Sequence, residues 1–197
     1  MDDFVALDFE RVNRHYASIC SIGVVRSRDG VLGDPAHFWI RPPAGYDVLE
    51  PRIASLTGIR ESDYADAPDA RTQVANIVRC IGQSVVVGHG VASADLPMLA
   101  QAHEVVGLGP LRALAYLDTV AVARVVLGPN RNSYKLPAVY RASVGEAMPG
   151  RHHNAADDAW ACARIVQAWA QEGRDLSQHV RWRSSGLIRP VAPPPIC

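Results

Sequence analysis

The sequence lacks an excess of charge of either sign, because its 20 basic and 20 acidic side chains give a formal net charge of zero. Proteins that hold long duplex DNA through many phosphate contacts are usually clearly basic. The balance therefore argues against a broad electrostatic clamp and is compatible with a small, localised binding site. Lysine is almost absent, since Lys135 is the only one, and arginine supplies the remaining positive charge.

Cysteine is also scarce, and none of the four cysteines lies in a C-x-x-C pair. The chain is too long to be a small disulfide-stapled scaffold. Cys20 and Cys162 fall inside apolar patterns, which indicates buried free thiols. These features predict a reduced, intracellular protein.

Long hydrophobic runs are missing as well. The longest apolar candidate, 111–127, is interrupted by Arg112, Asp118 and Arg124, so no stretch is expected to span a bilayer. The first residues are acidic and do not resemble the basic start of a signal peptide. We therefore expect a cytoplasmic protein without a membrane segment.

Strand-like segments come first in the chain. Residues 4–10, 17–26 and 36–40 have the composition of β-strands, and Asp29-Gly30 is a turn signal between the last two. Three strands joined by turns predict an antiparallel meander. Two shorter strands are expected later, at 84–87 and 114–118.

Apolar residues at helical spacing dominate the rest of the chain. Helices are expected from about Pro68 to Ile81, around 96–103, over 120–126 and 136–142, and from about Asn154 to Gln171. This order predicts an α/β fold, in which helices flank a mixed five-stranded sheet whose three antiparallel strands come first. One domain, 1–173, is expected to precede a loosely ordered, Pro-rich tail, 174–197.

Asp8 and Glu10 share one face of the first expected strand, because alternate residues of a strand point the same way. That face is otherwise apolar, with Phe4 and Ala6. Two carboxylates are costly at a buried strand end, and a bound Mg²⁺ or Mn²⁺ would offset the cost. A strand that ends in solvent could carry the same residues freely, so the pair alone does not predict a metal site.

Two further acids lie at expected helix starts. Asp95 opens the helix after the fourth strand, where an acid favours the helix dipole without any chemistry. Asp158 lies near the start of the last helix, and its i+4 neighbour Cys162 borders the apolar stripe, so Asp158 leans toward the core and needs a partner. His153 precedes this helix and can lie over the same end. Asp157 and His152 are adequately explained as surface residues.

Taken together and in this order, the three elements resemble the DEDDh 3′→5′ exonucleases, a family that includes the proofreading subunits of bacterial replicative polymerases. The matching motifs are a strand-borne D-x-E, an Asp at a strand-to-helix junction, and H-x-A-x-x-D on a late helix. The run FVALDFERVN at 4–13 is close to the family's F-V-A-x-D-F-E-T-A-N. Lesser matches follow in order: Thr57-Gly58-Ile59, Ala67-Pro68, Leu117-Asp118-Thr119 and Ser133-Tyr134-Lys135-Leu136.

The chain departs from the family pattern at three positions beside these motifs. Gly90 replaces an Asn, Ala94 replaces an aromatic residue, and Arg11 replaces a Thr. None of these changes removes an implied metal ligand. They alter the shape of the implied nucleotide pocket.

The resemblance, which covers about residues 3–171, implies a ribonuclease H-like fold and a metal-dependent exonuclease. The implied activity removes nucleotides from the 3′ ends of single-stranded DNA or RNA. Asp8, Glu10, Asp95 and Asp158 are the implied ligands of two Mg²⁺ or Mn²⁺ ions, with Asp8 bridging both. His153 is the implied general base, because His152 lacks an Ala two residues further on.

Contacts to the substrate are also implied by the resemblance. The candidates are Arg11, Val12, Asn13, Thr57 and His89. Tyr16 and Tyr134 are further candidates that could stack on bases or simply pack.

Three other interpretations compete with a stand-alone exonuclease. A proofreading subunit would use a tail, here containing Trp182, Leu187 and Ile188, to bind a DNA polymerase, although disorder explains such a tail equally well. A non-catalytic nucleic-acid-binding relative would be expected to have lost some of the acids. A divalent-metal hydrolase of another fold does not fit the late H-x-A-x-x-D helix.

Overall fold

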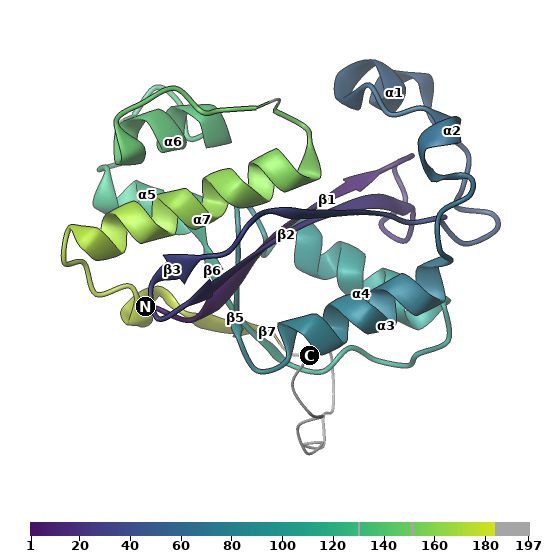
Figure 1. The fold of residues 1–197 in the computed structure, drawn as a ribbon, viewed down its shortest axis with the longest axis horizontal. Coiled ribbons are helices and arrows are strands. Elements are labelled where there is room, and N and C mark those ends of the chain that lie inside the picture. Colours follow the sequence, from purple (N-terminus) through teal and green to yellow (C-terminus); the bar gives the residue numbers. More distant parts are fainter. Residues whose placement is uncertain (130, 151, 184–197) are drawn as a thin grey trace.

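A mixed sheet runs through the centre of the protein, whose computed structural model describes residues 1–129, 131–150 and 152–183 (Figure 1). The sheet has seven strands in the order β3-β2-β1-β5-β6-β7, and β4 pairs with β2 outside this path. The strands are β1 (Phe4–Arg11), β2 (Ile19–Arg28), β3 (Val31–Leu32), β4 (Ala36–Trp39), β5 (Val85–Gly88), β6 (Leu114–Asp118) and β7 (Arg181–Arg183). All five expected strands are present, so the mixed α/β architecture is confirmed.

The two additional strands are short, and both correct the expected number of five. β3 follows the turn at Asp29-Gly30 and pairs with the end of β2. β7 pairs antiparallel with β6 and lies beyond residue 173, within the segment expected to be loosely ordered. Its three side chains are all exposed, so it has no apolar alternation, and backbone pairing with the open edge of β6 places it in the sheet. A short 3₁₀ turn, η1 (Ser177–His179), precedes it.

The rest of the expected tail, 184–197, lies outside the described residues. This segment contains the prolines as well as Leu187 and Ile188, which were candidates for a polymerase contact. The domain boundary at residue 173 stays a prediction.

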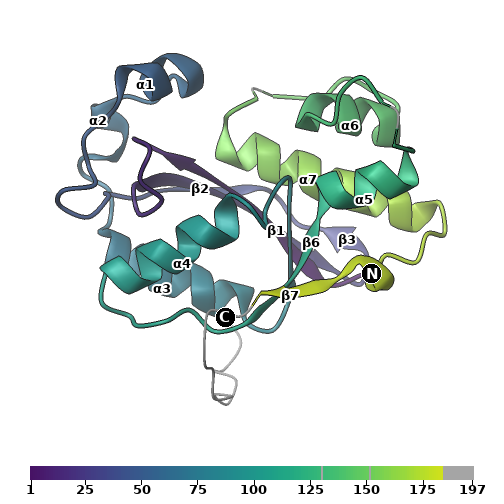
Figure 2. The ribbon, with the colours of Figure 1, turned by 180° about the vertical axis from the view of Figure 1, so that it is seen from behind.

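Helices cover both faces of the sheet (Figures 1 and 2). On one face lie α3 (Ala70–Ile81) and α4 (Asp95–Val105), and on the other lie α5 (Thr119–Val126), α6 (Leu136–Val144) and α7 (Ala155–Gln171). These five helices are the ones that the sequence predicts. Among the described residues, no helix is both long and apolar enough to cross a membrane.

Two short helices between β4 and α3 were not expected. They are α1 (Pro51–Thr57) and α2 (Glu61–Tyr64). Pro51 in the first turn of α1 and Gly58 as its left-handed C-cap are ordinary helix boundary signals. Neither helix is long enough to show an apolar stripe, and periodicity therefore did not reveal them.

The alternation of side chains along β1 separates two cores. Val5, Leu7 and Phe9 belong to the core beneath α3 and α4, whereas Phe4 and Ala6 belong to the core beneath α5, α6 and α7. Asp8 and Glu10 continue the second face at the carboxyl end of the strand, as their spacing predicts. The two acids therefore lie on the side of the sheet that α7 covers.

Gly23 permits α7 to approach the sheet closely. It is paired with Asp8 in the β1–β2 ladder. A Cβ at this position would lie 1.9 Å from the backbone oxygen of Ala155, the first residue of α7. The first turn of α7 can therefore rest against β2 only because position 23 has no side chain. This contact brings Asp158 to the same end of the sheet as Asp8.

Candidate active site

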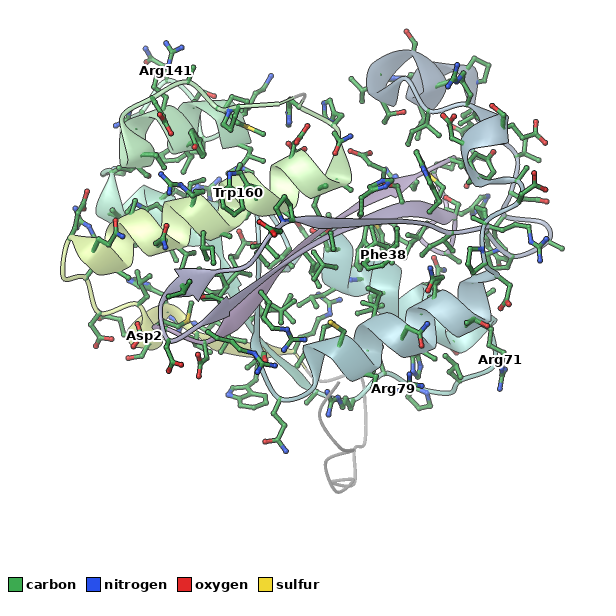
Figure 3. The ribbon with its side chains drawn as sticks, viewed as in Figure 1. Asp2, Phe38, Arg71, Arg79, Arg141 and Trp160 are labelled. Carbon is green, nitrogen blue, oxygen red and sulfur yellow. The ribbon has the colours of Figure 1, made fainter. Side chains whose placement is uncertain are left out.

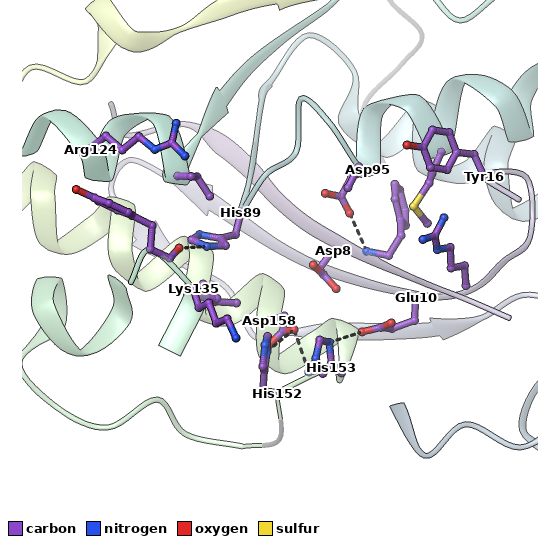
Figure 4. A pocket seen from close by; sticks show the side chains of 17 residues that line it. Asp8, Glu10, Tyr16, His89, Asp95, Arg124, Lys135, His152, His153 and Asp158 are labelled. Carbon is purple, nitrogen blue, oxygen red and sulfur yellow. Dashed lines mark hydrogen bonds and ion pairs between the residues drawn. The ribbon is translucent and has the colours of Figure 1, made fainter. Parts of the chain in front are cut away.

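Three carboxylates converge at the carboxyl end of β1 (Figure 4). Their ligand oxygens, one each from Asp8, Glu10 and Asp158, all lie within 4.8 Å of one another. The first two come from β1, and Asp158 comes from the first turn of α7. The acids border a pocket of about 890 Å³, so the cluster is open to a substrate.

Asp95 lies at the edge of this cluster and also lines the pocket. The pairing of β1 with β5 ends at Ala6. Beyond that point Asp95 reaches β1 from the start of α4, and its Oδ1 accepts a hydrogen bond from the backbone N–H of Phe9 at 3.1 Å. The side chain is almost completely buried, with the residue only 3% exposed. Asp95 thus joins the end of β1 to α4 and adds a fourth acid to the site.

Burial raises the pKa of each of these four acids. For Asp8 the pKa lies well above its ordinary value, and the charges of Asp95 and Asp158 raise it further. Burial followed by repulsion from neighbouring acids raises the pKa of Glu10 to about 8, and burial raises the pKa of Asp95 to about 7. Burial also raises the pKa of Asp158, against a hydrogen bond from His152.

This donor set fits divalent metal ions. Several carboxylates held this close repel one another, and without another cation this repulsion favours their protonated forms. Carboxylate oxygens are hard ligands of the kind that Mg²⁺ and Mn²⁺ prefer. The same crowding that raises the pKa values therefore favours ion binding at neutral pH.

We expect the metal-free protein to become less stable as the pH rises from about 4 to about 8. The folded pKa values of the acids lie above the unfolded values of about 4, so the folded state retains protons that the unfolded state has released. The stability that these protons confer is present below the unfolded pKa values and is lost as the pH rises through the folded ones, about 7 for Asp95 and about 8 for Glu10. The loss should be on the order of a few kcal/mol.

Thermal melts with Mg²⁺, with Mn²⁺ and with chelator measure this effect. Either ion should raise the melting temperature strongly at about pH 8 and weakly at about pH 5, because protons occupy the acids at the lower pH. A melting temperature that does not respond to either ion at the higher pH would show that the acids hold no metal.

Two adjacent histidines lie over the carboxylates (Figure 4). Nδ1 of His152 lies 3.1 Å from Oδ2 of Asp158, and the backbone N–H of His153 donates to the same oxygen at 3.1 Å. Nδ1 of His153 lies 3.9 Å from Oε1 of Glu10. The two rings are stacked, with their centroids 4.0 Å apart. No sequence pattern indicated the contact of His152 with Asp158.

The backbone at His153 is in the left-handed region, with φ at +69°. This conformation is strained for a residue with a side chain and is enriched at functional sites. It lies immediately before Asn154, the N-cap of α7, whose side chain accepts hydrogen bonds from two N–H groups of the first turn. Burial, followed by the proximity of His152, lowers the pKa of His153. Its imidazole is therefore neutral at pH 7 and able to accept a proton.

His89 lines the same pocket, but both of its ring nitrogens already have partners. Nδ1 lies 2.9 Å from Oγ1 of Thr119, and Nε2 lies 2.8 Å from the backbone oxygen of Tyr134. The ring thus connects the ends of β5 and β6 with the segment before α6. The expected contact of His89 with the substrate stays a prediction.

Asp118 is a residue of the site that sequence reasoning passed over. Its carboxylate accepts hydrogen bonds from Gly90 N–H at 3.0 Å and from Ala92 N–H at 3.2 Å, and it also caps α5. These bonds fix the loop that leads to Asp95. The only sequence signal was its place in the Leu117-Asp118-Thr119 match.

The remaining expected substrate contacts separate into two groups. Arg11 lines the pocket, where its guanidinium lies 5.6 Å from the ring centroid of Tyr16. Val12 and Asn13 are buried outside it, and the amide of Asn13 donates to two carbonyls of a neighbouring loop. Thr57 is buried in α1 and donates to a backbone oxygen there. A substrate role for these last three side chains stays a prediction, and their contacts give it no support.

Comparison of the sequence with known families gives one match. The RNase_T family model, described as Exonuclease, matches residues 5–166. This range contains all four acids and both histidines of the site. No curated protein sequence matches the chain.

Several solved structures share the fold. Exonuclease X in complex with 5′ overhanging duplex DNA has a TM-score of 0.68 and 23% identity, covering 89% of this chain and 96% of that one. A 3′-exonuclease that recognises the 3′ end of a histone mRNA stem-loop has a TM-score of 0.68 and 18% identity, with coverages of 99% and 96%. E. coli exonuclease I with a dA16 oligonucleotide has a TM-score of 0.69 and 16% identity.

The extent of these matches differs. The match with exonuclease I includes 87% of the present chain but only 41% of the length of exonuclease I. At such low identities the likeness establishes the fold, and it confirms the expected ribonuclease H-like architecture.

Proposed function

The chain belongs to the exonuclease family whose sequence model it matches over residues 5–166, and we propose that this 3′→5′ exonuclease hydrolyses single-stranded DNA or RNA with two divalent metal ions and a histidine general base. One observation carries the proposal. Asp8, Glu10 and Asp158, which come from opposite ends of the chain, lie within 4.8 Å of one another beside a neutral imidazole.

The three clustered carboxylates are the proposed ligands of the ions. Asp8 lies among the other acids, since Asp95, Asp158 and Glu10 all raise its pKa, and it would hold an ion together with Glu10 and Asp158. When bound, Mg²⁺ or Mn²⁺ would neutralise the phosphate and lower the pKa of the attacking water. Asp95 lies at the edge of this carboxylate cluster, where it also holds the end of β1 in place through the N–H of Phe9.

His153 is the proposed acceptor of the water proton. Its lowered pKa keeps the imidazole neutral, and Asp158 holds its backbone N–H at 3.1 Å. As the oxygen of the water bonds to phosphorus, its proton passes to His153, and the bond to the 3′ oxygen of the preceding nucleotide breaks. That oxygen leaves with the electron pair of the bond and takes a proton from solvent water. The chain thereby provides a fixed base next to the carboxylates.

The walls of the pocket supply the proposed contacts to the substrate. Arg11, His89 and Ala94 all line it. Ala94 stands where the family usually has an aromatic residue, so a small side chain lines the pocket at this point. Tyr16, with 39% of its surface exposed, offers a ring on which a base could stack.

A gel time-course on 5′-end-labelled single-stranded DNA and RNA tests the function. We expect a ladder that shortens from the 3′ end with Mg²⁺ or Mn²⁺ and stops with chelator. The relative rates on the two substrates decide between DNA and RNA. Products that do not shorten stepwise, or hydrolysis that persists in chelator, would contradict the proposal.

A further inference from the structure

Cations are concentrated around α6 in a chain without net charge. Residues 119–150 contain four basic side chains and one acid, Glu146. The four are Arg124, Arg131, Lys135 and Arg141. None of them forms an ion pair with any residue in the described part of the chain. Glu146 instead accepts a hydrogen bond from the hydroxyl of Tyr140 at 3.2 Å.

These cations line two neighbouring hollows. Arg124 and Lys135 border the pocket that holds the carboxylates. Arg131 and Arg141 border a second hollow of about 550 Å³, formed by α6 and the segment that follows it. His152 lines both hollows, so they adjoin at this residue. The described residues that line the second hollow include no acid, which makes it a favourable site for an anion.

Exonuclease chemistry restricts which anion can bind there. A 3′-terminal nucleotide is linked to its strand by one phosphodiester, and that phosphodiester must lie at the carboxylates when it is cleaved. Every other phosphate of the strand lies upstream of it. Cations away from the carboxylates therefore have upstream phosphates as their natural partners, and the guanidinium of Arg binds phosphate in a bidentate manner.

We propose that the hollow lined by Arg131 and Arg141 binds the phosphate backbone of a single strand, upstream of the bond that is cleaved. The strand leaves the carboxylates past Lys135 and His152 and follows α6. This inference rests on the proposed function and extends it from the terminal nucleotide to the strand behind it. It also explains how a chain with no net charge can hold a nucleic acid, because the contact is confined to one helix and its flanking segments.

The chain offers a matched control on the far side of the molecule. Figure 3 shows Arg141 at the upper left of the structure, and Arg71 and Arg79 along its lower right edge. Arg71 and Arg79 belong to α3, on the other face of the sheet from α6. The double variants R131A/R141A and R71A/R79A therefore remove the same charge from two different surfaces.

The test compares a single strand of about 12 nucleotides, which can reach the second hollow, with a dinucleotide, which cannot. For R131A/R141A we expect the ratio of kcat/KM between the two substrates to fall about 10-fold, mainly through a higher KM for the longer strand. The slope of log KM against log salt should decrease by about 1.4, or about 0.7 for each lost phosphate contact. R71A/R79A should change neither quantity, and R131K/R141K should restore most of the loss.

Each other outcome has a definite meaning. An unchanged substrate ratio and salt slope would overturn the inference, as would an equal loss for R71A/R79A. If R131A/R141A lowers kcat/KM more for a duplex with a 3′ overhang than for the single strand, the cations bind the complementary strand. The proposed path of the single strand is then wrong. If the unmodified protein cleaves neither the strand nor the dinucleotide, the proposed function itself fails.

Discussion

Replacing Asp8 by Asn is expected to abolish hydrolysis, by about 10⁴-fold or more, because the amide keeps the shape of the side chain but loses the charge that binds metal. The same change should stabilise the metal-free protein at about pH 8. Asp8 is crowded by Asp95, Asp158 and Glu10, and its raised pKa shows that its charged form is disfavoured there. Activity and stability should therefore change in opposite directions, which simple damage to the fold would not produce.

Two further variants sharpen this prediction. Asp158→Asn should abolish hydrolysis equally, but without the gain in stability, because Asp158 accepts hydrogen bonds from His152 and from the backbone of His153. Asp157→Asn is the matched control, since it changes the neighbouring acid on the same turn of α7. It should leave turnover nearly unchanged. Single-turnover assays and thermal melts measure all three, and normal turnover in D8N or D158N would refute the metal-ligand assignment.

Replacing His153 by Ala should lower kcat by about 10²- to 10⁴-fold, the usual contribution of a positioned general base. Metal affinity should change little, because the carboxylates remain. Added imidazole should restore part of the activity, which would not be expected if His153 only shaped the loop. In the unmodified protein kcat should persist at the ordinary histidine pKa of about 6.5 and fall only at more acidic pH, because the pKa of His153 is lowered.

His152→Ala is the decisive comparison for this assignment. Both imidazoles lie over the acids, and it is His152 whose ring contacts Asp158. We expect a loss smaller than that of His153→Ala, with no rescue by imidazole, because His152 positions Asp158 and does not take the proton. If His152→Ala is the crippling change and imidazole rescues it, the roles of the two residues are exchanged.

Local patterns predicted much of the fold. The alternation along 4–10 identified both faces of β1, and helical spacing located α3 to α7, because each of these elements buries one side against a core. β7 and the short helices α1 and α2 escaped prediction. They are too short to show a period, and β7 depends on the edge of β6 being open to receive it.

The four acids that the ordered motifs selected all line one pocket, and their role as metal ligands stays a prediction. Taken one at a time, Asp8, Asp95 and Asp158 had ordinary structural explanations, and only their joint order indicated chemistry. Contacts between distant segments were not accessible in this way. The hydrogen bond from Phe9 to Asp95, the bonds from Asp118 to the loop before α4, and the stacking of the two histidines all depend on backbone positions that the sequence does not display.

The sequence by itself determined the order of the five longer strands and of helices α3 to α7, the shared face of Asp8 and Glu10, and the resemblance to an exonuclease family. These features follow from local periodicity and from motifs a few residues long. Only the tertiary structure decided that Gly23 lets α7 rest against β2, that His152 shares Asp158 with His153, and that cations line a hollow beside the acids. The physical reason is that each of these depends on distances between segments far apart in the chain, which are set when the two faces of the sheet are packed.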